Sequence, residues 1–240
     1  MKVSPIIFVH IFFTLIIGLL FTTASYAEPP KDFSEAKKIA RYLFREHPIT
    51  LYCGCPYQKD SAIDWDACGY QPGRLRKRAK RMEWEHIVPA HAFGKNRSCW
   101  IGHCDKNAKC CKGRPCCQAR DTDFNKMEAD LHNLYPAIGE INAVRSNYQF
   151  KDLPNTPYRY YGKCLLKIDH KYRLIEPRPE AKGLIARAYL YMHQEYQVPL
   201  SSEERSQFER WSREHPADAW EKDWNQRVKV IQGNENTYIK

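Results

Sequence analysis

The feature that most constrains this chain is its cysteine content. It carries ten cysteines, and all of them lie beyond residue 50. An even number of cysteines in an exported chain is typical of a disulfide framework. A zinc site is the alternative, but no spacing here matches the paired C-x₂-C motifs of a zinc ribbon. Five bridges would admit hundreds of connectivities, so the pairing stays open. The residues concerned are Cys53, Cys55, Cys68, Cys99, Cys104, Cys110, Cys111, Cys116, Cys117 and Cys164.

The N-terminus predicts export. Lys2 is followed by an apolar run over residues 6–21 and by small residues that end at Ala27, as in a cleaved signal peptide. A membrane anchor is the alternative, since the run approaches the ~18 apolar residues that a spanning helix requires. The small residues and the lack of a second apolar run favour cleavage. We therefore expect a signal peptide over residues 1–27, a periplasmic or secreted protein, and no stable membrane association after cleavage.

Residues 28–240 predict one α+β domain. Apolar residues recur at helical spacing over residues 32–46 and 183–196 and in two further helices after Ser201, whereas residues 82–88 and 164–176 alternate as strands do. We expect the polar, cysteine-rich residues 93–124 to form a long loop held by disulfides. Pro136 suits the first turn of a helix that would carry Glu140 and Asn142. No repeat and no Pro/Ser/Gly-rich linker divides this part of the chain.

The net charge of +10 points to a polyanionic partner. The charge is concentrated before the Glu85-His86 pair and in the cysteine-rich segment after it. A solvated face is the usual interpretation of such runs, but two clusters around one candidate site favour a phosphate backbone. No base-reading motif is present, so binding should be salt-dependent and little selective for sequence. The first cluster is Arg74, Arg76, Lys77, Arg78, Lys80 and Arg81; the second is Lys106, Lys109, Lys112, Arg114 and Arg120.

The Glu85-His86 pair lies in the predicted strand over residues 82–88. It combines a hard oxygen ligand with an imidazole whose unperturbed pKa is near neutrality, which suits metal-assisted hydrolysis. Side chains of adjacent strand residues point to opposite faces unless the backbone bends. Taken alone, the pair is more typical of a half-exposed strand with a surface pair than of a metal site. Facing a short helix that offers the Asn142 oxygen, the pair would form an open site suited to Mg²⁺, which keeps several waters.

Motifs over nearly all of residues 28–240 resemble the bacterial endonuclease I family of periplasmic and secreted nucleases, which have a ββα-metal (His-Me finger) core. They are Leu51-Tyr52-Cys53-Gly54-Cys55, Cys68-Gly69-Tyr70, Glu83-Trp84-Glu85-His86-Ile87-Val88-Pro89-Ala90, Cys99-Trp100, Met127-Glu128-Ala129-Asp130-Leu131-His132-Asn133-Leu134, Pro136-Ala137-Ile138-Gly139-Glu140-Ile141-Asn142, Arg145-Ser146-Asn147 and Gln232-Gly233-Asn234.

The resemblance implies a role for each matching residue. Glu85 and Asn142 fall on the family's metal ligands, and His86 falls on the general base. Arg114 falls on an arginine that holds the cleaved phosphate, while Glu128 and His132 fall on supporting positions near the site. The implied activity is non-specific, Mg²⁺-dependent hydrolysis of duplex DNA, single strands and RNA to 5′-phosphate and 3′-OH ends, with Ca²⁺ or Mn²⁺ as other candidate ions.

Two departures from the family pattern concern the site's surroundings. Ala143-Val144 replaces the usual Gly-Asp before Arg145, and an insertion with three cysteines precedes Arg114.

The alternative function is an exported, disulfide-rich, basic protein that binds nucleic acid without cutting it. Such a protein would need none of Glu85, His86 and Asn142. In either case we expect a monomer whose contacts with DNA or RNA run through the phosphate backbone.

Overall fold

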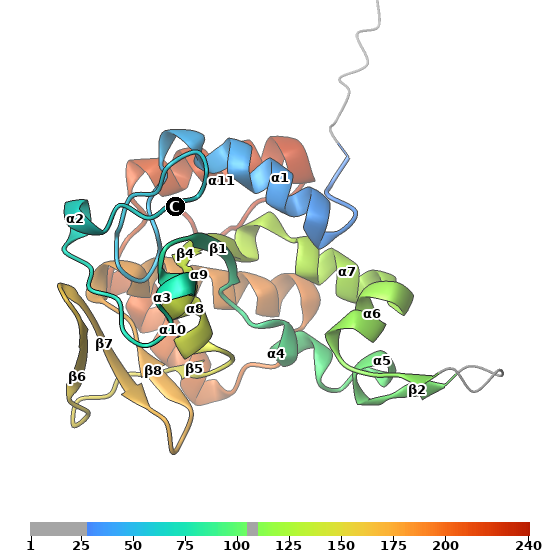
Figure 1. Ribbon diagram of the computed structural model, residues 1–240. Coiled ribbons are helices and arrows are strands. Elements are labelled where there is room, and N and C mark those ends of the chain that lie inside the picture. Colours follow the sequence, from blue (N-terminus) through green and yellow to red (C-terminus); the bar gives the residue numbers. More distant parts are fainter. Residues whose placement is uncertain (1–27, 105–109) are drawn as a thin grey trace, which may run out of the picture.

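The computed structural model describes residues 28–104 and 110–240 (Figure 1). The predicted signal peptide, together with Lys106 and Lys109 of the second basic cluster, lies outside these residues. The α+β prediction is confirmed. In chain order the described elements are α1 (Phe33–Leu43), η1 (Phe44–Glu46), α2 (Trp65–Cys68), α3 (Arg76–Ala79), β1 (Met82–His86), α4 (Ala90–Gly94), α5 (Ser98–Ile101), β2 (His103–Cys104), β3 (Cys110–Cys111), α6 (Arg114–Arg120), α7 (Thr122–Ala129), η2 (Leu131–Asn133), β4 (Leu134–Ile138), α8 (Gly139–Arg145), β5 (Gln149–Phe150), β6 (Tyr158–Tyr161), β7 (Cys164–Asp169), β8 (Leu174–Glu176), α9 (Pro179–Tyr196), α10 (Ser202–Glu214) and α11 (Ala219–Gln232).

A two-stranded antiparallel ribbon lies at the centre of the fold. Strands β1 and β4 pair with Glu85 opposite Tyr135, and helix α8 follows β4 without a loop. Every residue of β4 is buried, whereas β1 mixes buried and partly buried positions. The unit is therefore two strands followed by a helix, with the Glu85-His86 pair at the end of the first strand (Figure 1).

The prediction that Pro136 begins a helix is wrong. Pro136 lies in β4 opposite Trp84, and the helix begins at Gly139. A proline lacks the amide hydrogen needed for a ladder, but an outer strand of a narrow ribbon tolerates that loss. The carbonyl of Pro136 still accepts a hydrogen bond from the Leu51 amide at 2.8 Å. Pairing with β1 and complete burial thus outweigh the local preference of proline for a first helical turn.

Long amphipathic helices enclose the ribbon. Helix α1 buries Ala36, Ala40 and Leu43, and Asp32 caps its N-terminus by accepting from the Glu35 amide at 2.9 Å. Helix α9 packs against α10, whose predicted capping box of Ser201 and Glu204 is present. Figure 1 shows α1 and α11 along one side of the molecule and the sheet of β5, β8, β7 and β6 at another. Among the described residues, none of the helices combines the length and apolarity that crossing a bilayer would demand.

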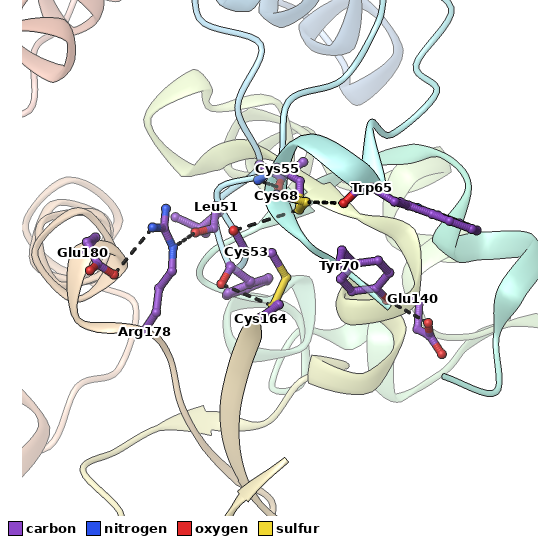
Figure 2. Close-up of a disulfide and its surroundings, with 12 residues drawn as sticks. Leu51, Cys53, Cys55, Trp65, Cys68, Tyr70, Glu140, Cys164, Arg178 and Glu180 are labelled. Atoms are coloured by element: carbon purple, nitrogen blue, oxygen red, sulfur yellow. Dashed lines mark hydrogen bonds and ion pairs between the residues drawn. A yellow bond between two sulfur atoms is a disulfide. The ribbon is translucent and has the colours of Figure 1, made fainter. Parts of the chain in front are cut away.

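All ten cysteines are paired, which leaves no thiolate for zinc. Figure 2 shows the bridge that joins Cys53, in the segment before β1, to Cys164 on β7. This bridge fastens the four-stranded sheet to the segment that contains Tyr52. The other pairs are Cys55–Cys68, Cys99–Cys117, Cys104–Cys110 and Cys111–Cys116.

The expectation of a long loop over residues 93–124 is wrong. This segment contains α5, the β2 and β3 strands, α6 and the start of α7. Helices of four and seven residues are too short to display a clear 3.6-residue period, so the pattern could not reveal them. The predicted disulfide staples are present, because Cys99 on α5 is bonded to Cys117 on α6.

Candidate active site

His86 is held with one ring nitrogen bonded and the other available. Its Nε2 lies 2.8 Å from the carbonyl oxygen of Glu128. Because a carbonyl can only accept, Nε2 carries the hydrogen and Nδ1 carries the lone pair. Nδ1 makes no hydrogen bond with any described residue. Burial, with the nearby charge of Arg114, lowers the pKa of His86 to about 3. The sequence suggested a pKa near neutrality, whereas here the imidazole is a neutral base across the physiological range.

The Phe33 ring lies close to the His86 ring and to two cations. The Phe33 ring centroid, at the start of α1, lies 4.6 Å from that of His86. The guanidinium carbon of Arg114 lies 5.0 Å from the Phe33 centroid, and Lys37 Nζ lies 4.6 Å from it. Two cations and the His86 ring therefore lie around one aromatic ring, and the positive charge suits an anionic substrate.

Glu128 links His86 to Arg114. Its backbone carbonyl accepts from His86, while its carboxylate accepts from Arg114 Nε and lies 3.0 Å from Gln118 Nε2 through each oxygen. The Glu128 side chain is 1% exposed, whereas that of Arg114 is 37% exposed. Nη2 of Arg114 is buried and has no hydrogen-bond partner among residues 28–104 and 110–240. One residue thus orients a base and a cation, and leaves a donor of that cation free for an anionic oxygen.

Glu85 contacts a different set of side chains. Its Oε1 accepts the Tyr52 hydroxyl at 2.6 Å and lies 3.0 Å from Arg145 Nη1. Burial raises the pKa of Glu85, while Arg145 and Tyr52 act in the opposite sense. Burial also raises the pKa of Tyr52, so its hydroxyl stays protonated and donates. Within the described part of the chain, no residue donates a hydrogen bond to Oε2 of Glu85, which leaves that oxygen available.

Arg145 ties the end of α8 to the Glu85-His86 strand. It is fully buried and donates to the carbonyls of His86, at 2.9 Å, and of Ile87. Asn142 lies three residues earlier, on the same face of α8, and is partly exposed. Its side-chain amide bonds to no described residue. The Ala143-Val144 departure therefore leaves the helix end anchored to β1 through Arg145.

The Glu85 carboxylate and the Asn142 amide fit a hard divalent cation. Both are oxygen donors, and each has an oxygen that no described side chain bonds. A buried carboxylate whose pKa is raised by burial would gain stability from a cation beside it. No group of three or more His, Cys, Asp or Glu side chains in the described ranges could hold a metal, so this pair would leave most coordination positions to water. That donor set matches the preference of Mg²⁺.

Glu140 connects α8 to the first basic cluster. Its carboxylate accepts the Tyr70 hydroxyl at 2.7 Å and the amides of Gly73 and Leu75 at 2.9 and 2.8 Å (Figure 2 shows Tyr70 and Glu140). The segment before α3 is thereby fixed two residues from Asn142. Within the cluster, Arg78 and Arg81 pair with Glu83. The remaining cations are exposed: Arg74, Arg76, Lys77 and Lys80.

His132 lies apart from the other predicted site residues. Its ring packs 4.6 Å from that of Tyr191 and 5.5 Å from that of Trp224, and Nε2 lies 3.3 Å from the Asn234 carbonyl. These partners belong to α9, α11 and the C-terminal segment. Its contacts among the described residues include none with Glu85, His86, Arg114 or Asn142. Contacts around β1 therefore connect Glu85, His86, Glu128 and Arg114. Asn142 lies one turn before Arg145 on α8, and His132 lies in the C-terminal core.

Sequence reasoning missed several residues that shape the site. The Asn133 side chain accepts a hydrogen bond from the Val88 amide at 2.7 Å and donates one to the Val88 carbonyl at 2.9 Å. These two bonds hold the backbone just beyond His86. Asn133 and Arg145 both lie within quoted motifs, so that signal was available. Tyr52 also lies within a quoted motif, whereas Phe33 and Gln118 carried no local signal, since their contacts with the site arise only from folding.

Comparison with known proteins shows which family this chain resembles over its length. The family model described as Endonuclease I matches residues 22–240. An extracellular deoxyribonuclease of Aeromonas hydrophila is 42% identical over 230 residues, covering 94% of this chain and 95% of that protein. A periplasmic deoxyribonuclease of the same organism is 42% identical and covers 92% and 90%. Endonuclease-1 of Buchnera aphidicola subsp. Acyrthosiphon pisum is 40% identical and covers 87% and 80%.

Proposed function

The chain belongs to the endonuclease I family, and we propose that it is a metal-dependent endonuclease of the periplasm or the extracellular space. Its substrates are duplex DNA, single-stranded DNA and RNA, and its products carry 5′-phosphate and 3′-OH ends. The observation that carries the proposal is the state of His86, a neutral imidazole with Nε2 bonded to a carbonyl and Nδ1 free. A protein that only bound nucleic acid would need no base prepared in this way.

In the reaction His86 is the general base. Nδ1 takes a proton from a water molecule whose oxygen attacks the phosphorus, and the bond from phosphorus to the 3′-oxygen breaks. The leaving oxygen receives a proton from solvent and becomes the 3′-OH, while the attacking oxygen stays on the 5′-phosphate. The Glu128 carbonyl keeps the hydrogen on Nε2 throughout. The reaction therefore requires the tautomer that the structure contains.

Arg114 supplies positive charge at the phosphate. Its guanidinium is oriented by the Glu128 carboxylate through Nε, and no residue that the structure describes accepts a hydrogen bond from Nη2. Donors fixed before the reaction stabilise developing negative charge without reorganising, which is an efficient form of electrostatic catalysis. We assign Arg114 to the non-bridging oxygens and to the cleaved phosphate.

Glu85 and Asn142 would hold the cation, with Mg²⁺ as the expected ion and Ca²⁺ or Mn²⁺ as alternatives. Bound there, a divalent cation would polarise the phosphate and offset the charge on the leaving oxygen. Tyr52 and Arg145 hold the Glu85 carboxylate in place through contacts with its Oε1. The exposed cations of the segment before β1 would bind neighbouring phosphates without reading sequence. Nothing in this mechanism needs a second copy, and we expect a monomer.

The test is cleavage of supercoiled plasmid by the oxidised chain of residues 28–240, with Mg²⁺ and with EDTA. We expect Mg²⁺-dependent nicking, and a loss on the order of 10²–10⁴-fold in rate for His86→Ala. His91→Ala is the matched control, because His91 is exposed and lies five residues away. Cleavage by His86→Ala at the wild-type rate would refute the assignment of His86 as the general base. An intact plasmid that is nevertheless retarded in a gel would favour a binding protein without catalysis.

A further inference from the structure

The outer face of strand β6 presents two exposed tyrosines. Strand β6 is the edge of the sheet ordered β5-β8-β7-β6 (Figure 1). Tyr158 is 50% exposed and Tyr160 is 70% exposed, whereas Tyr161, of the opposite parity, is 3% exposed. Because side chains alternate along a strand, both exposed rings lie on one face, about 6.6–7 Å apart along it.

A lysine lies against one of these rings, and the sheet segment that contains them is rich in exposed cations. Lys167 lies opposite Tyr158 in the register, with Nζ 5.0 Å from the ring centroid. In residues 151–176 five Lys and Arg side chains are exposed: Lys151, Arg159, Lys163, Lys171 and Arg173. The acidic residues of that segment are all partly buried. Asp152 and Glu176 are paired with Lys182, and Glu176 also lies 3.1 Å from Lys167 Nζ. The segment that carries the two rings is therefore cationic overall, with its acidic groups largely neutralised.

The end of strand β6 adjoins the segment that leads to the candidate active site. The Gln71 amide donates to the Tyr161 carbonyl at 3.0 Å, and the rings of Tyr70 and Tyr161 are stacked with centroids 6.1 Å apart. Gly73 lies between Tyr161 and the Glu140 carboxylate of α8. The first basic cluster begins at the next residue. The end of β6 therefore lies next to the start of this cluster.

We propose that the outer face of β6, formed by Tyr158, Tyr160 and Lys167, is a stacking platform for single-stranded nucleic acid. Flat aromatic rings spaced along a cationic surface bind successive bases through their π-faces, whatever the sequence. A duplex cannot use such a platform, because its bases already stack on one another. The inference rests on the proposed nuclease function and adds to it a separate contact for single-stranded substrates.

The experiment measures binding without turnover. Fluorescence anisotropy is recorded for a labelled twelve-residue oligothymidine and for a labelled twelve-base-pair duplex, with the His86→Ala chain in EDTA. Adding Tyr160→Leu should weaken binding of the single strand about tenfold, equivalent to about 1.4 kcal/mol. Duplex affinity should change less than twofold. The slope of log affinity against log salt should stay the same, because the substitution removes no charge.

Two further variants separate stacking from structural effects. Tyr160→Phe keeps the ring and should retain single-strand affinity, whereas Tyr158→Leu should weaken it as Tyr160→Leu does. Tyr42→Leu is the matched control, since Tyr42 is 62% exposed with Arg45 over its ring but lies on α1. Equal losses on duplex and single strand, or unchanged single-strand affinity, would overturn the platform. Failure of the wild-type chain to cut plasmid would refute the nuclease proposal and leave these affinities interpretable.

Discussion

The double contact made by Glu128 allows base and cation to be tested separately. The His86 imidazole bonds to the backbone carbonyl of Glu128, and Arg114 bonds to its carboxylate. Glu128→Gln preserves the backbone and the side-chain volume but removes the negative charge. His86 should therefore keep its orientation, while Arg114 loses the partner that fixes its guanidinium.

The magnitude follows from the contacts that are lost. Hydrogen bonds to a charged group contribute about 1.5–3 kcal/mol, and the Glu128 side chain is 1% exposed, so solvent screens it little. The single carbonyl oxygen of a glutamine can accept from Arg114 or from Gln118. Its amide NH₂ group then faces the other of these two donors, and the two cannot form a hydrogen bond. Partners that orient active-site groups typically change activity about 10–100-fold when substituted. We expect kcat/KM for DNA to fall by about that factor.

The assay is initial-rate cleavage of a fluorogenic oligonucleotide in Mg²⁺, together with inhibition by inorganic phosphate. Because Arg114 is proposed to hold the cleaved phosphate, the inhibition constant for phosphate should rise along with the loss of activity. Gln118→Met is the control, since it removes the 3.0 Å contacts to Glu128 but leaves the charge pair with Arg114. An unchanged kcat/KM in Glu128→Gln, or an equal loss in Gln118→Met, would refute the reasoning. Melting temperatures close to that of the wild type in both variants would show that the loss of activity does not come from unfolding.

Two other predictions concern the basic cluster and acid stability. Glu140→Gln weakens the hydrogen bond that holds the Leu75 amide, and with it the segment that carries the first basic cluster. We therefore expect KM for DNA to rise about tenfold with kcat nearly constant. A fall in kcat alone would contradict this. The bond from Arg97 lowers the pKa of Asp121, so Asp121 stabilises the fold above its usual pKa and this contribution is lost as the pH falls through the lowered value. Urea titrations should therefore show Asp121→Asn to be less stable than wild type at pH 7, with a difference that narrows below about pH 4. Asp123→Asn, at a 68% exposed side chain, should show little difference at either pH.

The sequence by itself determined the elements whose signals are local. The helix after Asp32, the capping box at Ser201 and the strand that carries the Glu85-His86 pair depend on residues three or four positions apart, or on alternation within one strand. Family motifs added Glu85, His86, Asn142, Arg114 and Glu128 as candidate residues, and these lie around the β1–α8 unit. Export, the α+β class and the presence of a disulfide framework followed from composition and order alone.

Only the tertiary structure decided how those groups are held. Tyr52 reaches Glu85 across 33 residues and Tyr70 reaches Glu140 across 70. The pairing of Cys53 with Cys164 closes a separation of 111 residues. Local propensity carries no information about such contacts, because burial and strand pairing contribute more than the preference of any one residue. The same reason put Pro136 in a strand, moved His132 into the C-terminal core and lowered the pKa of His86 through burial.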